Sequence, residues 1–244
     1  MRLAVISDIH SNSYALEAVI NDLKKQTPDA IICLGDITMR GPLPAESLGL
    51  LRKMQPMATI RGNFDDLFTR YPHQNWTIKH KDITQRAYEY DCERLSLEEQ
   101  NWLGNLQMAY KFELENISIE CYHASPHSLI HTAPAWAPMD ELEQLKQQES
   151  TKILLYGHLH HSYIRYSGGT VYVNCGSVGA PYDGDNRASY AILDLKQGNV
   201  ACQLRRVSYD LEKAIQVARQ QRMPDFEAFE YALRFARYPY DKMN

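Results

Sequence analysis

Five short segments of this 244-residue sequence place an acid, an amide or a histidine within a few residues of the end of an apolar run. The segments are Asp8-x-His10, Gly35-Asp36, Gly62-Asn63, His123 and Gly157-His158-x-His160. Carboxylate, amide and imidazole groups are ligands that divalent transition metals accept in proteins. One histidine at the end of a strand is usually structural, whereas five such segments together predict a metal site. The glycines beside several of them would let the backbone approach a crowded centre closely.

The first of these segments follows the apolar residues 3–6, which predict a buried strand. We expect the chain to remain extended through Asp8 and His10. Side chains two positions apart in an extended chain point the same way, so these two groups would face a single ion.

The elements that must position these residues alternate in the first half of the chain. Apolar runs at 3–6, 30–34 and 57–60 are separated by helical patterns, the second of which covers about 45–54. This rhythm predicts βαβ units and a parallel sheet. In such sheets ligands bind beyond the carboxyl ends of the strands, which is where the first three segments lie.

The second half of the chain has a different pattern. Alternating residues predict hairpins that pair 109–115 with 117–122, 163–166 with 170–174 and 190–195 with 200–207. A buried strand at 153–156, an acidic helix at 140–149 and two terminal helices complete the pattern. A parallel half followed by an antiparallel half predicts two sheets packed face to face, with helices outside.

Composition excludes several classes of partner. The net charge of −4 is spread along the chain without a basic face, so we expect no bulk nucleic-acid binding. No apolar run approaches the ~20 residues of a membrane helix, and Asp8 interrupts the N-terminal run where a signal sequence would continue. We therefore expect a cytoplasmic protein without a membrane partner. The five cysteines lack paired metal-type spacing, which favours reduced core thiols.

No Gly-, Ser- or Pro-rich linker divides the sequence. We expect one domain over residues 1–244, with 66–108 and 127–151 as cap or insertion segments.

The order D-x-H, G-D, G-N, H and G-H-x-H over residues 3–195 resembles the calcineurin-like metallophosphoesterases. Two further runs, His123-Ala124-Ser125-Pro126 and Gly176-Ser177-Val178-Gly179, are similar to the compact bacterial and archaeal phosphodiesterase branch. The resemblance implies an α/β fold, a four-layer αββα sandwich of two mixed β-sheets flanked by helices, with a dinuclear metal centre. It assigns Asp8, His10 and His160 to the first metal, Asp36 to both, and Asn63, His123 and His158 to the second. These ligands suit Mn, Fe, Zn or Co.

The activity that the resemblance implies is hydrolysis of a phosphoester by a metal-bridging hydroxide. Two neighbouring cations generate hydroxide near neutral pH and polarise a phosphoryl oxygen, so no serine or cysteine nucleophile is needed. Asp36 and Asn63 are then catalytic as well as ligating. The expected partner is a small phosphorylated substrate such as a nucleotide.

Many members of the family carry a histidine directly after the Gly-Asn pair, where this sequence has Phe64. Phenylalanine cannot donate a proton to a leaving group. Either His127, His131 or a metal-bound water takes that role, or the leaving group needs little help. The second alternative favours phosphoanhydrides and aryl esters over alkyl monoesters, and dinucleoside polyphosphates are one such class.

Two arginines adjoin the motifs. Arg40 follows Asp36 at the spacing of the Gly-Asp-x-x-x-Arg-Gly run of related protein phosphatases, and Arg61 adjoins Asn63. A guanidinium can bind a phosphate through two nitrogens, although a surface salt bridge is the commoner role of an arginine. We predict that Arg61 is catalytic and that Arg40, Asn63 and His127 bind substrate.

Aromatic residues lie between the motifs at Trp76, Trp136 and Tyr182, where a base could stack, although ordinary packing is the commoner role of each. Two alternatives to a nucleotide hydrolase remain open. A phosphoprotein phosphatase is supported by Arg40-Gly41 and Arg61-Gly62-Asn63. A non-catalytic protein-binding scaffold is known for the same fold in a retromer subunit, but there the metal site is degraded, and here all seven ligand positions are intact.

Overall fold

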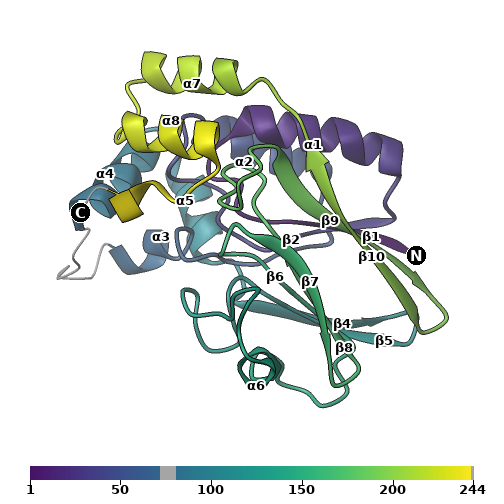
Figure 1. The fold of residues 1–244 in the computed structure, drawn as a ribbon. Helices are drawn as coiled ribbons and strands as arrows, with labels where there is room; N and C mark the ends of the chain where they lie inside the picture. The colour runs from purple at the N-terminus through teal and green to yellow at the C-terminus, as the bar shows by residue number, and fades with distance from the viewer. Residues whose placement is uncertain (72–80, 243–244) are drawn as a thin grey trace.

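Two five-stranded sheets lie at the centre of the protein (Figure 1). The structure is a computed structural model that describes residues 1–71 and 81–242. The first sheet has the order β10-β9-β1-β2-β3 and the second the order β4-β5-β6-β8-β7. The strands of the first sheet are β1 (Arg2–Ile6), β2 (Ala30–Cys33), β3 (Ala58–Thr59), β9 (Ala188–Lys196) and β10 (Asn199–Val207). Those of the second are β4 (Ala109–Leu114), β5 (Ile117–Tyr122), β6 (Ile153–Tyr156), β7 (Ser162–Ser167) and β8 (Thr170–Cys175).

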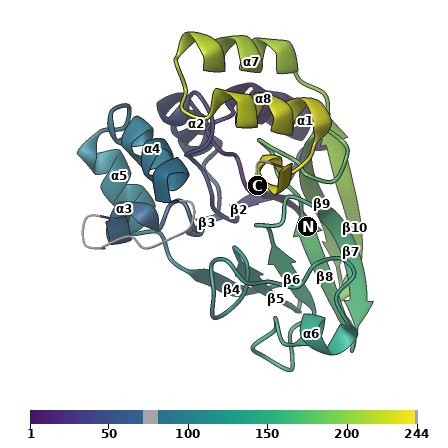
Figure 2. The ribbon, with the colours of Figure 1, turned by 60° about the vertical axis from the view of Figure 1, so that its left-hand side comes forward.

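Most of the helices lie on the side of the first sheet, and Figure 2 shows α7 and α8 stacked above the others. The larger helices are α1 (Ser13–Gln26), α2 (Pro44–Met54), α4 (Lys81–Cys92), α5 (Leu97–Gly104), α7 (Leu211–Gln220) and α8 (Phe226–Phe235). The shorter ones are α3 (Leu67–Arg70), α6 (Met139–Glu143) and the 3-10 helix η2 (Pro239–Lys242). The expected segment 66–108 therefore holds α3, α4 and α5, and 127–151 holds α6.

Strand β1 shows how one sheet separates two cores. Leu3 and Val5 face the second sheet and belong to the buried cluster between the sheets. Ala4 and Ile6 point the other way, into the cluster under the helices. Successive side chains of a strand point to opposite faces, so an entirely apolar strand is the expected sequence for a sheet buried on both sides.

The outer face of the second sheet has a thin cover. Tyr122, Tyr156 and Tyr172 are buried there beneath α6 and the loop that contains Ala133. The predicted sandwich of two mixed sheets flanked by helices is confirmed, with α6 and loops as its fourth layer. The acidic helix expected over 140–149 is shorter, because the amides of Gln147 and Gln148 turn to donate to the buried Glu120 carboxylate, both at 2.9 Å.

We predicted that the first half of the chain forms parallel strand pairs and the second half antiparallel pairs. This prediction is only partly correct. Parallel pairing extends beyond the first half, because β5, β6 and β8 are parallel neighbours in the second sheet. The late hairpin β9–β10 returns to the first sheet, where β9 pairs antiparallel to β1 and Arg2 lies opposite Asp194. The third strand is also shorter than expected, since the chain leaves β2 after Thr59 and Arg61 donates its amide to Gln107.

Among the described residues, no helix combines the length and apolarity that crossing a membrane requires. All five cysteines are free thiols, three of them fully buried.

Candidate metal centre

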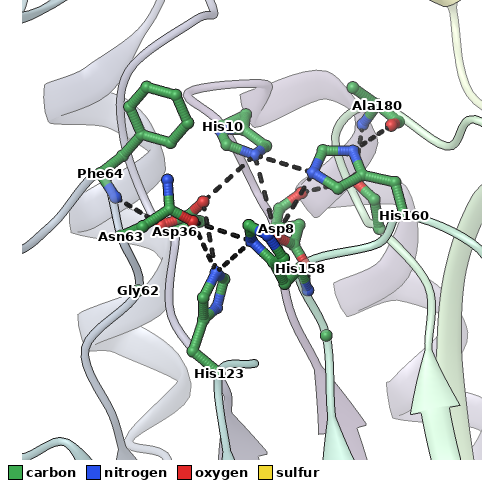
Figure 3. A network of polar contacts seen from close by, with 12 residues as sticks. Asp8, His10, Asp36, Gly62, Asn63, Phe64, His123, His158, His160 and Ala180 are labelled. Carbon is green, nitrogen blue, oxygen red and sulfur yellow. Dashed lines mark hydrogen bonds and ion pairs between the residues drawn. The ribbon is translucent and has the colours of Figure 1, made fainter. Parts of the chain in front are cut away.

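The five segments singled out in the sequence meet at one edge of the two sheets. Asp8, Asp36 and Asn63 follow the parallel strands β1, β2 and β3, and His123 and His158 follow the parallel pair β5 and β6. Because parallel strands end at the same edge of a sheet, their loops deliver side chains to one place. Figure 3 shows the seven side chains pointing toward one another.

The chain does not stay extended through Asp8 and His10, contrary to our expectation. Strand β1 ends at Ile6, and both residues have positive φ angles, 53° and 46°. Backbone bonds to the neighbouring loop cause the turn: the Asp8 amide donates to Gly35 at 3.0 Å and the His10 amide to Asp36 at 3.1 Å. Non-glycine residues adopt this left-handed conformation only where the surrounding structure holds them, typically at functional sites.

The first group of converging ligand atoms consists of Asp8, His10 and His160, all buried. The two histidine Nε2 atoms lie 3.1 Å apart. Asp8 Oδ1 lies 3.4 Å from His160 Nε2 and 3.9 Å from His10 Nε2, and it has no hydrogen-bond partner.

The second group consists of Asp36, His123 and His158, with Asn63 beside them. Asn63 Oδ1 lies 3.0 Å from His123 Nε2 and 2.9 Å from His158 Nδ1. The two imidazole nitrogens are themselves 3.3 Å apart. Asn63 and His158 are only partly buried, so this group lies nearer to solvent than the first.

Asp36 connects the two groups. Its Oδ2 atom lies 3.7 Å from His10 Nε2 and 3.5 Å from His123 Nε2, while its Oδ1 accepts the Phe64 amide at 2.8 Å. This is the position that a carboxylate bridging two ions must occupy.

Each histidine is held by a backbone carbonyl at its other ring nitrogen. His10 Nδ1 faces Met39, His123 Nδ1 faces Leu34, His160 Nδ1 faces Ala180 and His158 Nε2 faces Ile130, at distances from 2.5 to 3.2 Å. A carbonyl only accepts, so the nitrogen facing it carries the proton. The converging nitrogen is then a bare lone pair, which is how metal-binding histidines are oriented.

The lone pairs of His10 and His158 carry no proton. Burial lowers the pKa of His158 to about 3 and holds that of His10 well below its ordinary value, so both rings are neutral. Two acceptors about 3 Å apart repel each other unless a cation lies between them. Ligand atoms that each lie about 2.0–2.2 Å from one ion are about 3–3.5 Å from one another, which matches the spacings here. The residues therefore fit two metal ions.

Asp65 holds the loops that carry the second group. Its carboxylate accepts the amides of Asp36 at 2.8 Å, Ile37 at 3.1 Å and Gly62 at 2.9 Å. Burial raises the pKa of Asp65, and these donated hydrogen bonds act in the opposite direction. Asp65 thus joins the loop after β2 to the loop after β3.

A cleft of about 670 Å³ opens beside the two groups. Asp36, Asn63, His158 and His160 form its floor, and Arg40 and Phe64 are among its walls. Its volume lies in the range of small-molecule sites. A substrate phosphate placed here would reach both groups.

Two of the predicted substrate or catalytic residues lie elsewhere. The Arg61 guanidinium donates to the Gly104 carbonyl at 2.6 Å, and its Nε lies 3.3 Å from Asp66, so it joins α3 and α5 rather than lining the cleft. His127 is exposed and does not line the cleft, and the same holds for His131. Arg40, by contrast, lines the cleft, and its binding of substrate stays a prediction.

The three aromatic candidates also differ in position. Tyr182 lines the cleft, and its ring stacks on His160 with centroids 4.3 Å apart. Trp136 is 74% exposed and stands 6.1 Å from the His161 ring at the rim. Trp76 lies outside the described residues.

Sequence reasoning missed the contribution of the chain end. Tyr231, Arg237 and Tyr238 line the cleft, although they follow every recognised motif. The related signal in the sequence is the apolar stripe of α8, which predicts that this helix packs against the protein. That stripe does not tell where the residues after the helix lie.

Comparisons with known proteins agree with this geometry. The model of the calcineurin-like phosphoesterase superfamily domain matches residues 1–198. An uncharacterized protein of Methanocaldococcus jannaschii is 29% identical over 242 residues, which cover 92% of this chain and 94% of that protein.

Two solved structures have a similar fold over almost the whole chain. A metallophosphoesterase from Sphaerobacter thermophilus matches with a TM-score of 0.75 and 25% identity, over 97% of this chain and 99% of its own. A hypothetical protein from Pyrococcus horikoshii matches with a TM-score of 0.83 and 20% identity, over 95% and 97%. The resemblance seen in the motifs is confirmed, and this chain belongs to the calcineurin-like phosphoesterase superfamily.

Proposed function

We propose that this protein is a dinuclear metal-dependent hydrolase that cleaves phosphodiester or phosphoanhydride bonds of nucleotides, such as dinucleoside polyphosphates. The observation that carries the proposal is that imidazole nitrogens and a carboxylate, which accept rather than donate hydrogen bonds here, lie close together. The facing Nε2 atoms of His10 and His160, 3.1 Å apart, need a cation between them, and Asp36 lies where it would contact a second.

Different side chains would hold each of the two metal ions and the substrate. Asp8, His10 and His160 would hold one ion, Asn63, His123 and His158 the other, and Asp36 both. When bound, the two ions supply a hydroxide near neutral pH and positive charge for the phosphoryl oxygens. The partly buried amide of Asn63 stands at the cleft floor, where its NH₂ group can donate to a phosphate oxygen.

The nature of the leaving group follows from Phe64. This ring lines the cleft at the position where a proton donor would stand, and it has no proton to give. A phosphate or a nucleotide leaves as an anion that needs little protonation. We therefore favour anhydrides and activated esters over alkyl monoesters.

The experiment is metal reconstitution followed by a substrate comparison. The protein freed of metal by a chelator should be inert toward bis(4-nitrophenyl) phosphate and regain activity with Mn²⁺, Fe²⁺, Zn²⁺ or Co²⁺. Diadenosine tetraphosphate should then be cleaved with a higher kcat/KM than an alkyl phosphate monoester. Protein that stays inert toward all substrates with every metal would favour the protein-binding scaffold instead.

A phosphoprotein phosphatase is the second candidate. Arg40 favours it, because the guanidinium lies in the cleft next to the ligand groups. Arg61, the other arginine that suggested it, contacts Gly104 and Asp66 instead. A phosphoserine peptide hydrolysed faster than diadenosine tetraphosphate would favour this candidate.

A further inference from the structure

One wall of the cleft beside the metal-ligand groups combines two arginines with aromatic rings. Arg40 comes from the loop after β2, and Arg237 and Tyr238 come from the chain end after α8. Tyr182 and Tyr231 complete this wall. Figures 1 and 2 both draw the yellow segment that follows α8 below that helix, on the side away from α7.

Arg40 is packed among rings. Its guanidinium carbon lies 5.4 Å from the centroid of Phe64, 5.8 Å from that of Tyr238 and 5.0 Å from that of Tyr240. Arg40 itself has a positive φ of 64°, a backbone conformation that is uncommon for residues other than glycine. Ring faces attract a cation, but they do not neutralise its charge.

The described groups that pack around the Arg40 guanidinium are aromatic rings rather than carboxylates. Burial raises the pKa of Tyr240, so this phenol is neutral near pH 7. Asp225, which lines a small adjoining cavity with Arg40, is already paired with Arg86 at 2.5 Å. Among the side chains that the structure describes, those of residues 1–71 and 83–240, no carboxylate forms an ion pair with Arg40 or Arg237.

The cleft as a whole therefore has an excess of cationic groups on this wall. Asp36 is the one acidic residue among its described lining, and it belongs to the metal-ligand groups. A partly buried guanidinium without a counter-charge is costly, and a bound anion removes that cost. Arginine binds phosphate through two parallel hydrogen bonds.

We propose that Arg40 and Arg237 form a subsite for a second phosphate group, the one bonded through oxygen to the attacked phosphate, and that Tyr238 contacts the nucleoside beyond it. This inference rests on the proposed function and specifies its substrate as a linked di- or polyphosphate. Tyr238 is 40% exposed and stands 5.5 Å from the Tyr182 ring, which leaves part of its surface free for a base.

The test compares two inhibitors of bis(4-nitrophenyl) phosphate hydrolysis by the Mn²⁺-loaded protein. Inorganic phosphate has one phosphorus, whereas methylenediphosphonate has two joined through carbon and is not hydrolysed. We expect the diphosphonate to bind more tightly than phosphate by about tenfold or more in the wild type. Arg237→Gln should reduce this ratio by about tenfold.

Arg222→Gln is the matched control, because it removes an exposed arginine that does not line the cleft. It should leave the ratio unchanged. An equal ratio in the wild type and Arg237→Gln would overturn the subsite. Arg237 is exposed, so its replacement should leave folding intact, and a thermal unfolding midpoint equal to that of wild type would verify this.

The nucleoside contact has its own comparison. Adenosine 5′-(α,β-methylene)diphosphate should bind more tightly than methylenediphosphonate by about fivefold or more, and Tyr238→Leu should remove this gain. Tyr166→Leu, at a 66% exposed tyrosine of β7, should retain it. A gain that survives in Tyr238→Leu would contradict the contact.

Failure of the proposed function can be told apart from failure of the subsite. Protein that never hydrolyses bis(4-nitrophenyl) phosphate contradicts the proposed hydrolase. Calorimetric titration of the Mn²⁺-loaded protein with the same compounds still measures the affinity ratio. If Arg237→Gln lowers the ratio of the diphosphonate affinity to the phosphate affinity in that titration, the subsite is supported. If the ratio is the same in both proteins, the subsite is overturned.

Discussion

The ring of Phe64 stands edge-on to His10, with centroids 5.4 Å apart and planes 83° from parallel. A ring without an acidic proton thus lies beside the first ligand group and lines the cleft. This relationship accounts for the expected preference for good leaving groups, and it leads to the first prediction.

Phe64→His should accelerate hydrolysis of alkyl phosphate esters more than that of nitrophenyl esters. A positioned imidazole can protonate a poor leaving group, and such general acid catalysis is worth about a hundredfold or more when the geometry is right. We expect a gain of about tenfold for the alkyl ester, measured as kcat/KM, because the new side chain is not supported by evolved neighbours. Phe64→Leu is the control that removes the ring without adding a proton. Equal gains for both classes of ester would contradict this interpretation of Phe64.

Removing the carboxylate shared by both groups should disrupt the whole centre. Asp36→Asn keeps the shape of the side chain but replaces one oxygen, and Asp36 Oδ2 lies within 3.7 Å of histidines from both groups. We expect less than two metal ions per chain by elemental analysis and a loss of activity of about a hundredfold or more. Asp140→Asn, at an exposed acid of α6, should change neither quantity. Full activity with two ions bound in Asp36→Asn would rule out the bridging role.

A buried acid away from the ligands should make stability depend on pH. The Asp91 carboxylate accepts the Met39 amide at 2.7 Å, and burial raises its pKa to about 7. The ordinary pKa of about 3.9 applies in the unfolded chain, so between these values only the folded protein binds the proton. The free energy of unfolding therefore falls as the pH rises toward 7, and this contribution is constant above it.

Asp91→Asn should remove that dependence. Chemical denaturation of the chelator-treated protein at pH 5 and pH 8 measures it, because other groups titrate equally in both proteins. The variant should gain on the order of 3 kcal/mol relative to wild type between these two pH values. Parallel stability curves would show that Asp91 does not titrate in this range.

Two glycines should respond oppositely to alanine. A Cβ on Gly62 would lie 2.1 Å from Asp36 Oδ1 and 2.3 Å from the Asp36 amide nitrogen, which Asp65 holds in place. Gly62→Ala should lower the free energy of unfolding by about 2 kcal/mol or more and weaken metal binding. Gly49 lies within α2 with nothing near its Cβ position, so Gly49→Ala should raise the free energy of unfolding by about 1 kcal/mol. Urea denaturation measures both, and a tolerated Gly62→Ala would contradict the close packing of the two loops.

The sequence by itself determined most of the strands, and its resemblance to a known family implied the mixed sandwich and the residues of the candidate centre. Apolar runs such as residues 3–6 are local signals, and residues that follow such a run closely, such as Asp36 and His123, are expected at a strand end. The types of these side chains, taken together in this order, indicate metal ligation before any coordinate is known.

Only the tertiary structure decided how those residues face one another. The left-handed turn at Asp8 and His10 depends on hydrogen bonds to the loop after β2, which no local pattern encodes. The carbonyls that orient each histidine come from segments as distant as Met39 and Ala180.

The two arginines illustrate the same limit. Arg40 and Arg61 both adjoin motifs in the sequence, yet packing places one in the cleft and joins the other to Gly104. Arg237 has no motif beside it and still lines the cleft, because α8 directs the chain end there. Spacing along a chain determines which groups share a strand or a helix face, whereas the position of a long flexible side chain depends on contacts formed only after the chain has folded.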